Sequence, residues 1–415
     1  MHGVKLERID IGRSPDHPGH TRLTGVVRYD RPRDGVAEEA CWYDVPDAFA
    51  AALTTSGNPW LAGLLPVAVT LGEPLTLVRP VDATLLDNAH DLMAIWQAWY
   101  PHLSAVRIDA DVTADSDAAA LTSGAHGQRT ACFFSGGVDS FCVALRQRAA
   151  PIDDLVLVLG TFDLVDATPA ALERVRTTLQ RAADALGKTL VPVTTNQMRT
   201  QMRHSDPRNL SGVSLLSAAA LALEHRWRRV IVAAGCDLDT IVPTAANPLA
   251  TPLLSTGRVR FDDEGVAMSR VAKTAVVARS DAALAALRVC FRSGDESNCM
   301  RCVKCIRTAT ALEALGVLSR ATGFGTRSLD PARVERVAVT EMIDRHYFGE
   351  LPPFCRAHGR PDLARAAERA LARARRHDPF RPLVRWMRTL PLVGTATHRL
   401  EAVVQDADVA TRVRR

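Results

Sequence analysis

The sequence has few aromatic residues, very little lysine and no long apolar run. Only four of its 51 basic residues are lysines, namely Lys5, Lys188, Lys273 and Lys304. No window approaches 18 uninterrupted apolar residues, which argues against a transmembrane helix. The first 13 residues are charged where a secretory signal needs an apolar stretch. We therefore expect a cytoplasmic protein whose thiols stay reduced.

The composition is that of a globular protein. Over 415 residues, 47% are hydrophobic and 23% are charged, which excludes a disordered chain, a collagen-like chain and a small disulfide scaffold. The length predicts two or three domains. The formal charge of +5 is unevenly distributed along the chain, because residues 351–415 carry 14 arginines against six acidic residues.

Four segments differ in their patterning. Residues 1–110 combine strand-like runs with an amphipathic helix at 83–99, and they predict an N-terminal α+β module. Residues 111–129, rich in Ala, Ser, Asp and Gly, predict a linker. In residues 130–320, apolar runs at 131–134, 155–160, 189–193 and 229–234 alternate with helical stretches. This alternation predicts an α/β fold with a doubly wound parallel sheet, whose ligand site lies at the carboxyl ends of the strands. Residues 321–415 predict a basic helical C-terminal region.

The sharpest motif follows the first of these apolar runs and opens a helix. It reads Ser135-Gly136-Gly137-Val138-Asp139-Ser140. Glycines let backbone amides approach an anion, and a helix N-terminus adds unpaired N–H groups. The serine hydroxyls can bind phosphate oxygens, and Asp139 suits Mg²⁺ that accompanies phosphates. The alternative is an ordinary helix cap.

This motif resembles the signature of the PP-loop ATP pyrophosphatase superfamily, which has a HUP/Rossmann-like core. The resemblance implies that ATP is cleaved between its α and β phosphates, with the six motif residues holding the pyrophosphate end. It also implies catalytic roles for Asp139, Ser140 and Lys273, the last in a segment similar to a Lys-Thr segment of the family. Asp163, after the second strand, is a candidate for ribose or metal, or a simple turn residue.

Four cysteines lie close together in the sequence. Cys290, Cys299, Cys302 and Cys305 have the spacing C-x8-C-x2-C-x2-C. In a reducing compartment such a spacing favours a structural zinc site. An iron–sulfur cluster and a redox or sulfur-relay pair remain as alternatives.

The loop and the cysteines together resemble 7-cyano-7-deazaguanine synthase and its relatives over residues 130–318. The resemblance implies an ATP-, Mg²⁺- and Zn²⁺-dependent ligase that adenylates a carboxylate or amide oxygen of a small molecule, releasing pyrophosphate and AMP. Residues 235–240 do not match the substrate-side pattern of the synthase, so its deazaguanine substrate is not carried over. A tRNA sulfurtransferase and a non-catalytic nucleotide-binding module are the alternative functions.

Three segments are expected to converge on the substrate, namely 194–197, 235–240 with Asp237 and Asp239, and 269–274. His204, in a polar loop, is a candidate general base or a solvated residue. In the tail, residues 361–376 and 381–391 predict two helices that pack on the core with solvated arginines, or that bind an anionic partner. The sequence leaves a homo-oligomer open.

Overall fold

The structure is a computed structural model, and it describes residues 3–113 and 128–376. Its strands are β1 Val4–Arg13, β2 His20–Tyr29, β3 Glu38–Pro46, β4 Leu75–Leu77, β5 Ile108–Asp109, β6 Arg129–Phe133, β7 Asp154–Leu159, β8 Thr189–Thr195, β9 Trp227–Ala233 and β10 Arg260–Glu264. Its α-helices are α1 Asn58–Leu71, α2 Ala83–Trp99, α4 Val138–Leu145, α5 Pro169–Ala185, α6 Gly212–Leu221, α7 Arg270–Val277, α8 Asp281–Ala286, α9 Val303–Ala314, α10 Pro331–Arg336, α11 Met342–Gly349, α12 Leu351–Ala357 and α13 Pro361–Arg376.

All ten strands belong to one sheet in the order β10-β9-β6-β7-β8-β3-β2-β1-β4-β5. The five strands from β10 to β8 are parallel. From β6 the chain passes to β7 and β8 on one side, and then returns to β9 and β10 on the other. This arrangement confirms the α/β part of the predicted fold class and is compatible with a doubly wound, Rossmann-like core. The order reverses between β6 and β9, and such a switch point opens a crevice at the strand ends.

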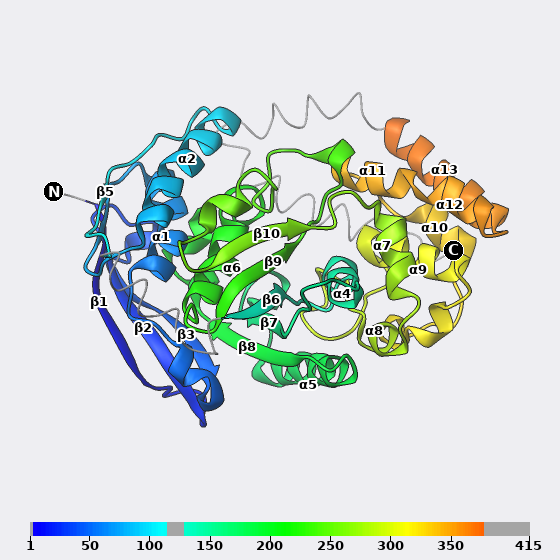
Figure 1. Cartoon of the computed structure of the whole chain (residues 1–415). Helices are drawn as coiled ribbons and strands as arrows, with labels where there is room; N and C mark the ends of the chain where they lie inside the picture. The colour runs from blue at the N-terminus through cyan, green and yellow to red at the C-terminus, as the bar shows by residue number, and fades with distance from the viewer. Residues whose placement is uncertain (1–2, 114–127, 377–415) are drawn as a thin grey trace.

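The sheet separates two hydrophobic cores, because successive side chains of a strand point to opposite faces. On β6, Ala131 belongs to one core and Cys132 to the other. On β9, Val230 and Ile231 divide in the same way. Helices α1, α2 and α6 cover the first face, while α4, α5 and the helices from α7 onward supply the second core (Figure 1). Both faces of the parallel strands are therefore buried.

The N-terminal strands continue the sheet of the parallel core. Strand β3 pairs antiparallel with β8 through Tyr43–Thr195 and Asp44–Thr194. Helix α1, which the sequence analysis did not predict, packs against α6 across the same junction. The division into domains stays a prediction, but residues on both sides of the 111–129 segment share one sheet and one core.

The C-terminal helices lie at the end of the molecule opposite β1–β3 (Figure 1). Helix α13 buries Leu363, Ala366 and Ala367, and it packs against α10 and α12. For residues 361–376 this agrees with packing on the core. The helix expected at 381–391 lies outside the described residues. Within the described residues, no helix combines the length and apolarity needed to cross a membrane.

Candidate functional site

The glycine-rich motif forms the turn between β6 and α4, at the switch point of the sheet. Gly136 has φ +77°, and a Cβ there would lie 2.7 Å from Leu179 Cδ2, so this position requires glycine. The Ser140 hydroxyl is buried and donates to the Gly137 carbonyl at 3.1 Å. Ser135, by contrast, is exposed. The turn thus presents Ser135 outward, while Ser140 bonds back to the turn itself.

Asp139, in the first turn of α4, is paired with two basic side chains of α7. Arg270 Nη1 donates to Asp139 Oδ2, and Lys273 Nζ lies 3.3 Å from Asp139 Oδ1. Lys273 is 2% exposed and also donates to the Ala234 carbonyl at 2.7 Å. Burial alone would raise the pKa of Asp139, but the charges of Arg270 and Lys273 outweigh it and hold that pKa below its ordinary value. The predicted site residues Asp139 and Lys273 are therefore in contact.

Arg288 ties Asp163 to the same turn. Its Nη2 donates to Asp163 Oδ2, and its Nη1 donates to the Ser135 carbonyl at 3.3 Å. Its backbone N–H donates to the Gly136 carbonyl at 2.9 Å. Asp163 therefore lies beside the turn, as expected, with its carboxylate held by an arginine. Its role toward ribose or metal stays a prediction.

Helix α11 adds an aromatic side chain between two arginines. The guanidinium carbons of Arg270 and Arg307 lie 4.8 and 4.9 Å from the centroid of the Tyr347 ring. The Tyr347 hydroxyl donates to the Gly235 carbonyl, which also accepts from Arg270 at 2.8 Å. Arg288, Arg307 and Tyr347 were missed by the sequence analysis, and Arg270 was not singled out within the expected segment 269–274. The arginines follow no motif spacing that distinguishes them from the other arginines of the chain. There are 47 arginines in all, because four of the 51 basic residues are lysines.

The loop after β9 contributes Asp237, which meets two side chains of the α11 region. His346 Nε2 lies 2.9 Å from Asp237 Oδ2 and 3.9 Å from Glu350 Oε1. One ligand atom from each of the three residues falls within 4.8 Å of the others. Asp237 was a predicted candidate, whereas His346 and Glu350 were not. Asp239, the other candidate in this loop, is exposed.

The four predicted cysteines come together at the start of α9, where Cys302 is the N-cap, Cys305 lies in the first turn, and Cys290 and Cys299 lie in the preceding loops. Their sulfur atoms all lie within 4.8 Å of one another, with Cys302–Cys305 at 3.4 Å and Cys299–Cys305 at 3.9 Å. Zn–S bonds of about 2.3 Å in a tetrahedron separate the sulfurs by about 3.8 Å. Between Cys299 and Cys302 the chain turns at Met300, whose φ is +50°. All nine cysteines are free thiols in the described chain. The cluster can hold a metal ion such as zinc.

Residues of two predicted polar segments contact the N-terminal part of the chain. The Asn196 amide accepts from the Trp42 N–H at 2.8 Å and donates to the Ala40 carbonyl at 2.7 Å. It therefore ties the end of β8 to β3. The substrate role expected of 194–197 stays a prediction. His204 Nε2 lies 2.7 Å from Asp34 Oδ2, so this histidine is engaged by a loop of the N-terminal part.

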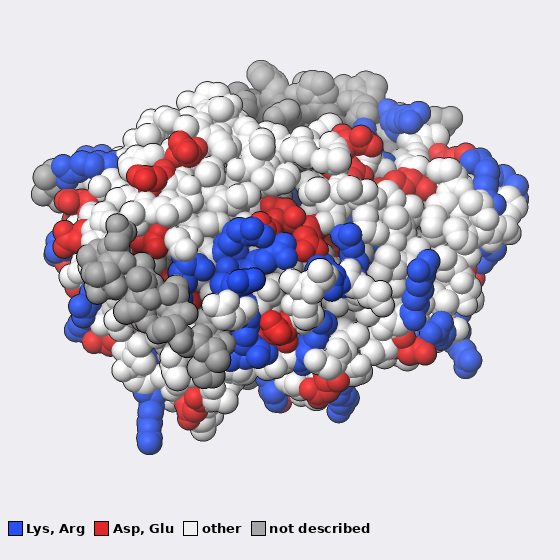
Figure 2. Space-filling view, viewed as in Figure 1, with Lys and Arg blue, Asp and Glu red and all other residues white. Residues whose placement is uncertain are grey.

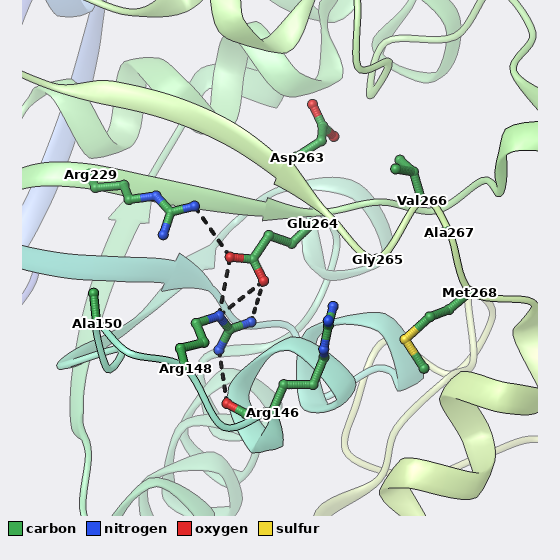
Figure 3. Close-up of a pocket in the computed structure, with 10 residues that line it drawn as sticks. All are labelled: Arg146, Arg148, Ala150, Arg229, Asp263, Glu264, Gly265, Val266, Ala267 and Met268. Carbon is green, nitrogen blue, oxygen red and sulfur yellow. Dashed lines mark hydrogen bonds and ion pairs between the residues drawn. The ribbon is translucent and has the colours of Figure 1, made fainter.

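A mixed-charge patch and a cavity lie over β9 and β10. Figure 2 shows basic and acidic side chains side by side near the centre of this face, in keeping with ion pairs such as Arg229–Asp262 at 2.6 Å. The cavity, of about 460 Å³, is lined on one side by Arg146 and Arg148 (Figure 3). Glu264 accepts from Arg148 and Arg229 at its wall. The eight-residue α4 separates these arginines from the glycine turn by about 12 Å. Gly265, on the same lining, lies closer to the turn, because a Cβ there would be 3.6 Å from Lys273 Nζ.

Comparisons with protein-family models, with curated proteins and with solved structures give no match for this chain.

Proposed function

We propose that this chain is an ATP-dependent enzyme of the AMP- and pyrophosphate-forming class, similar to 7-cyano-7-deazaguanine synthase. It would adenylate a carboxylate or amide oxygen of a small molecule. One observation carries the proposal. The turn Ser135–Ser140 stands at the switch point of a parallel sheet, and Arg270, Lys273 and Arg288 contact that turn or its carboxylate.

The electrostatics of the turn suit a polyphosphate. A helix N-terminus and a glycine turn provide backbone N–H groups for phosphate oxygens. Arg270 and Lys273 are largely buried, with 11% and 3% of their side chains exposed, so their charges are weakly screened by solvent. Without nucleotide they neutralise Asp139. When ATP binds, the phosphates would share these cations, and Asp139 is the carboxylate at the turn that would bind Mg²⁺ accompanying them.

The proposed reaction has two steps. An oxygen of the acceptor attacks the α-phosphorus of ATP, the bond from that phosphorus to the bridging oxygen breaks, and pyrophosphate leaves. A nitrogen nucleophile then attacks the activated carbon and AMP departs. Arg270 and Lys273 would stabilise the charge that develops on the departing pyrophosphate, which is where preorganised donors act most strongly.

The cysteine cluster would hold a structural Zn²⁺. Four thiolates fill a tetrahedral zinc site and leave no position for substrate. The convergence of all four sulfurs supports this assignment over a separate sulfur-relay pair. The Zn²⁺ would fix the loops before α9, the helix that carries Arg307 toward Tyr347.

The test follows the fate of labelled ATP. The full chain is incubated with Mg²⁺, candidate acceptors and ATP labelled at the α or the γ phosphate. We expect AMP and pyrophosphate as products, and a loss of about 100-fold or more in their formation with Asp139→Asn. Asp87→Asn, a change of the same kind at an exposed position of α2, is expected to stay within about twofold of the unaltered chain. Formation of ADP and orthophosphate, or an active Asp139→Asn variant, would contradict the proposal.

A further inference from the structure

The second cluster of ligand-type side chains lies beside the turn but is not part of it. We propose that Asp237, His346 and Glu350 bind a divalent transition-metal ion, at a site separate from the four cysteines. The residues come from two segments distant in sequence, the loop after β9 and the α11 region. This proposal concerns metal binding by the chain itself and does not require the nucleotide chemistry proposed above.

One ligand atom from each of the three side chains lies within 4.8 Å of the other two. His346 Nε2 lies 2.9 Å from Asp237 Oδ2 and 3.9 Å from Glu350 Oε1. Ligand atoms at about 2.1 Å from one metal ion are separated by about 3.0 to 3.4 Å. The first distance lies about 0.1 Å below this range, and the second reaches the range when the Glu350 side chain moves by about 1 Å or less.

The hydrogen bond between His346 and Asp237 does not account for the position of the Glu350 carboxylate. Glu350 Oε1 is buried and has no hydrogen-bond partner among the described residues. Its other oxygen accepts from the Val271 N–H at 2.9 Å, which fixes the carboxylate in place. A buried carboxylate oxygen without a donor is costly, and a cation between it and His346 would remove that cost.

Two basic side chains of this region, Arg270 and Arg307, pair with groups other than Asp237 and Glu350. Arg270 bonds to Asp139 and to the Gly235 carbonyl. Arg307 Nη1 lies 3.3 Å from Asp344 Oδ1. With neutral His346, the two carboxylates give the cluster a charge of −2, which matches a divalent cation.

The ligand set indicates the kind of metal. Imidazole with two carboxylates suits Mn²⁺, Fe²⁺ or Zn²⁺, whereas Mg²⁺ and Ca²⁺ prefer oxygen ligands alone. Three protein ligands leave coordination positions open, unlike the four-thiolate site. The His346 side chain is 32% exposed, so water or a ligand oxygen can reach these positions. The ion would lie at the switch point, next to the Gly235 carbonyl that binds Arg270 and Tyr347.

The experiment measures Mn²⁺ binding to the full chain by electron paramagnetic resonance. One equivalent of Zn²⁺ is added first, because thiolates take Zn²⁺ in preference to Mn²⁺. We expect one Mn²⁺ bound per chain, and at least tenfold weaker binding in His346→Gln. The matched control is His358→Gln on an exposed histidine, whose Nδ1 bonds to the Phe354 carbonyl of its own helix at 2.8 Å. This variant should bind Mn²⁺ as the unaltered chain does.

Glu350→Gln provides a second test, because it keeps the shape of the side chain and removes its charge. Far-ultraviolet circular dichroism verifies that each variant is folded. Reduced Mn²⁺ binding in both folded variants supports the proposal. It is overturned if the unaltered chain takes up no Mn²⁺ beyond the Zn²⁺-bound cluster, or if a folded His346→Gln variant binds Mn²⁺ with undiminished affinity. Neither result depends on ATP turnover.

Discussion

At the scale of single residues, two aspartates have pKa values shifted in opposite directions, because one has hydrogen-bond donors around its carboxylate and burial dominates at the other. Asp154 is fully buried at the start of β7, and it accepts from Arg129, Arg226 and Trp227. Burial alone would raise the pKa of Asp154, but these donors lower it below the ordinary 3.8. Asp263 has no hydrogen-bond partner among the described residues at either carboxylate oxygen, and burial raises its pKa to about 6.

These shifts predict stability changes of opposite sign. Asp154→Asn should lower the free energy of unfolding at pH 7 by about 3 kcal/mol, since it leaves the partly buried Arg129 and Arg226 without the carboxylate that they share. The stabilisation by Asp154 is complete above pH 3.8 and is lost as the pH falls through its lower folded pKa. Asp263→Asn should raise the free energy of unfolding at pH 7 by about 1–2 kcal/mol. That gain should fade between pH 6 and pH 3.8, because the folded state already protonates Asp263 there.

Urea unfolding from about pH 2 to pH 8 measures both effects, with the unaltered chain as the reference. Equal stability of the Asp263→Asn variant and the reference at pH 7 would show that this carboxylate is not destabilised by burial. A stability loss in Asp154→Asn that stays constant below pH 3.8 would likewise contradict its lowered pKa.

Residue types with a strong local signature could be predicted from the sequence. Gly136 and Asp139 belong to a contiguous motif, and the four cysteines have a metal-type spacing. Arg307 and His346 lie 168 and 207 residues beyond Asp139 in the chain. They reach the site only through the packing of α9 and α11, and no local pattern records such a contact.

At the scale of elements, the periodicity of apolar residues was sufficient to predict a helix or strand that buries only one face. Helix α2 begins and ends where predicted, because Asp82 caps it and one face alone is apolar. Helix α1 was missed because it is buried nearly all round and contains Gly63 and Pro66, residues that normally argue against a helix. Strand β10 was missed because it reads Arg-Phe-Asp-Asp-Glu, and its charges are accommodated by pairs such as Arg229–Asp262.

The cysteine loops and α9 form an element whose order should depend on metal. Cys302→Ser removes one of four ligands, so we expect the bound zinc to be lost and the unfolding free energy to fall by on the order of 3 kcal/mol. Cys142→Ser, at a buried cysteine of α4 outside the cluster, should keep its zinc. Metal analysis gives the stoichiometry, and hydrogen exchange follows the α9 amides. Full zinc content in folded Cys302→Ser would exclude the four-thiolate site.

At the scale of the whole molecule, the shared sheet and core predict that both halves unfold together. Trp60 of α1 and Trp227 of β9 are fully buried members of one core. At the α1–α6 contact, a Cβ on Gly63 would lie 3.3 Å from Ala218 Cβ. Gly63→Val should therefore force the two helices apart and cost about 1–3 kcal/mol. Gly12→Val is the control, because a Cβ there meets nothing within 4 Å.

Hydrogen exchange in increasing urea distinguishes one cooperative unit from two. If the core is continuous, amides of β1–β3 and of β6–β9 should open at the same urea concentration, since neither half can keep its buried surface dry without the other. Gly63→Val should then shift both sets to lower urea by equal amounts, although only α1 is altered. If the β1–β3 amides opened first while β6–β9 stayed protected, the two-residue β3–β8 ladder would be a contact between separately stable domains rather than the middle of one sheet.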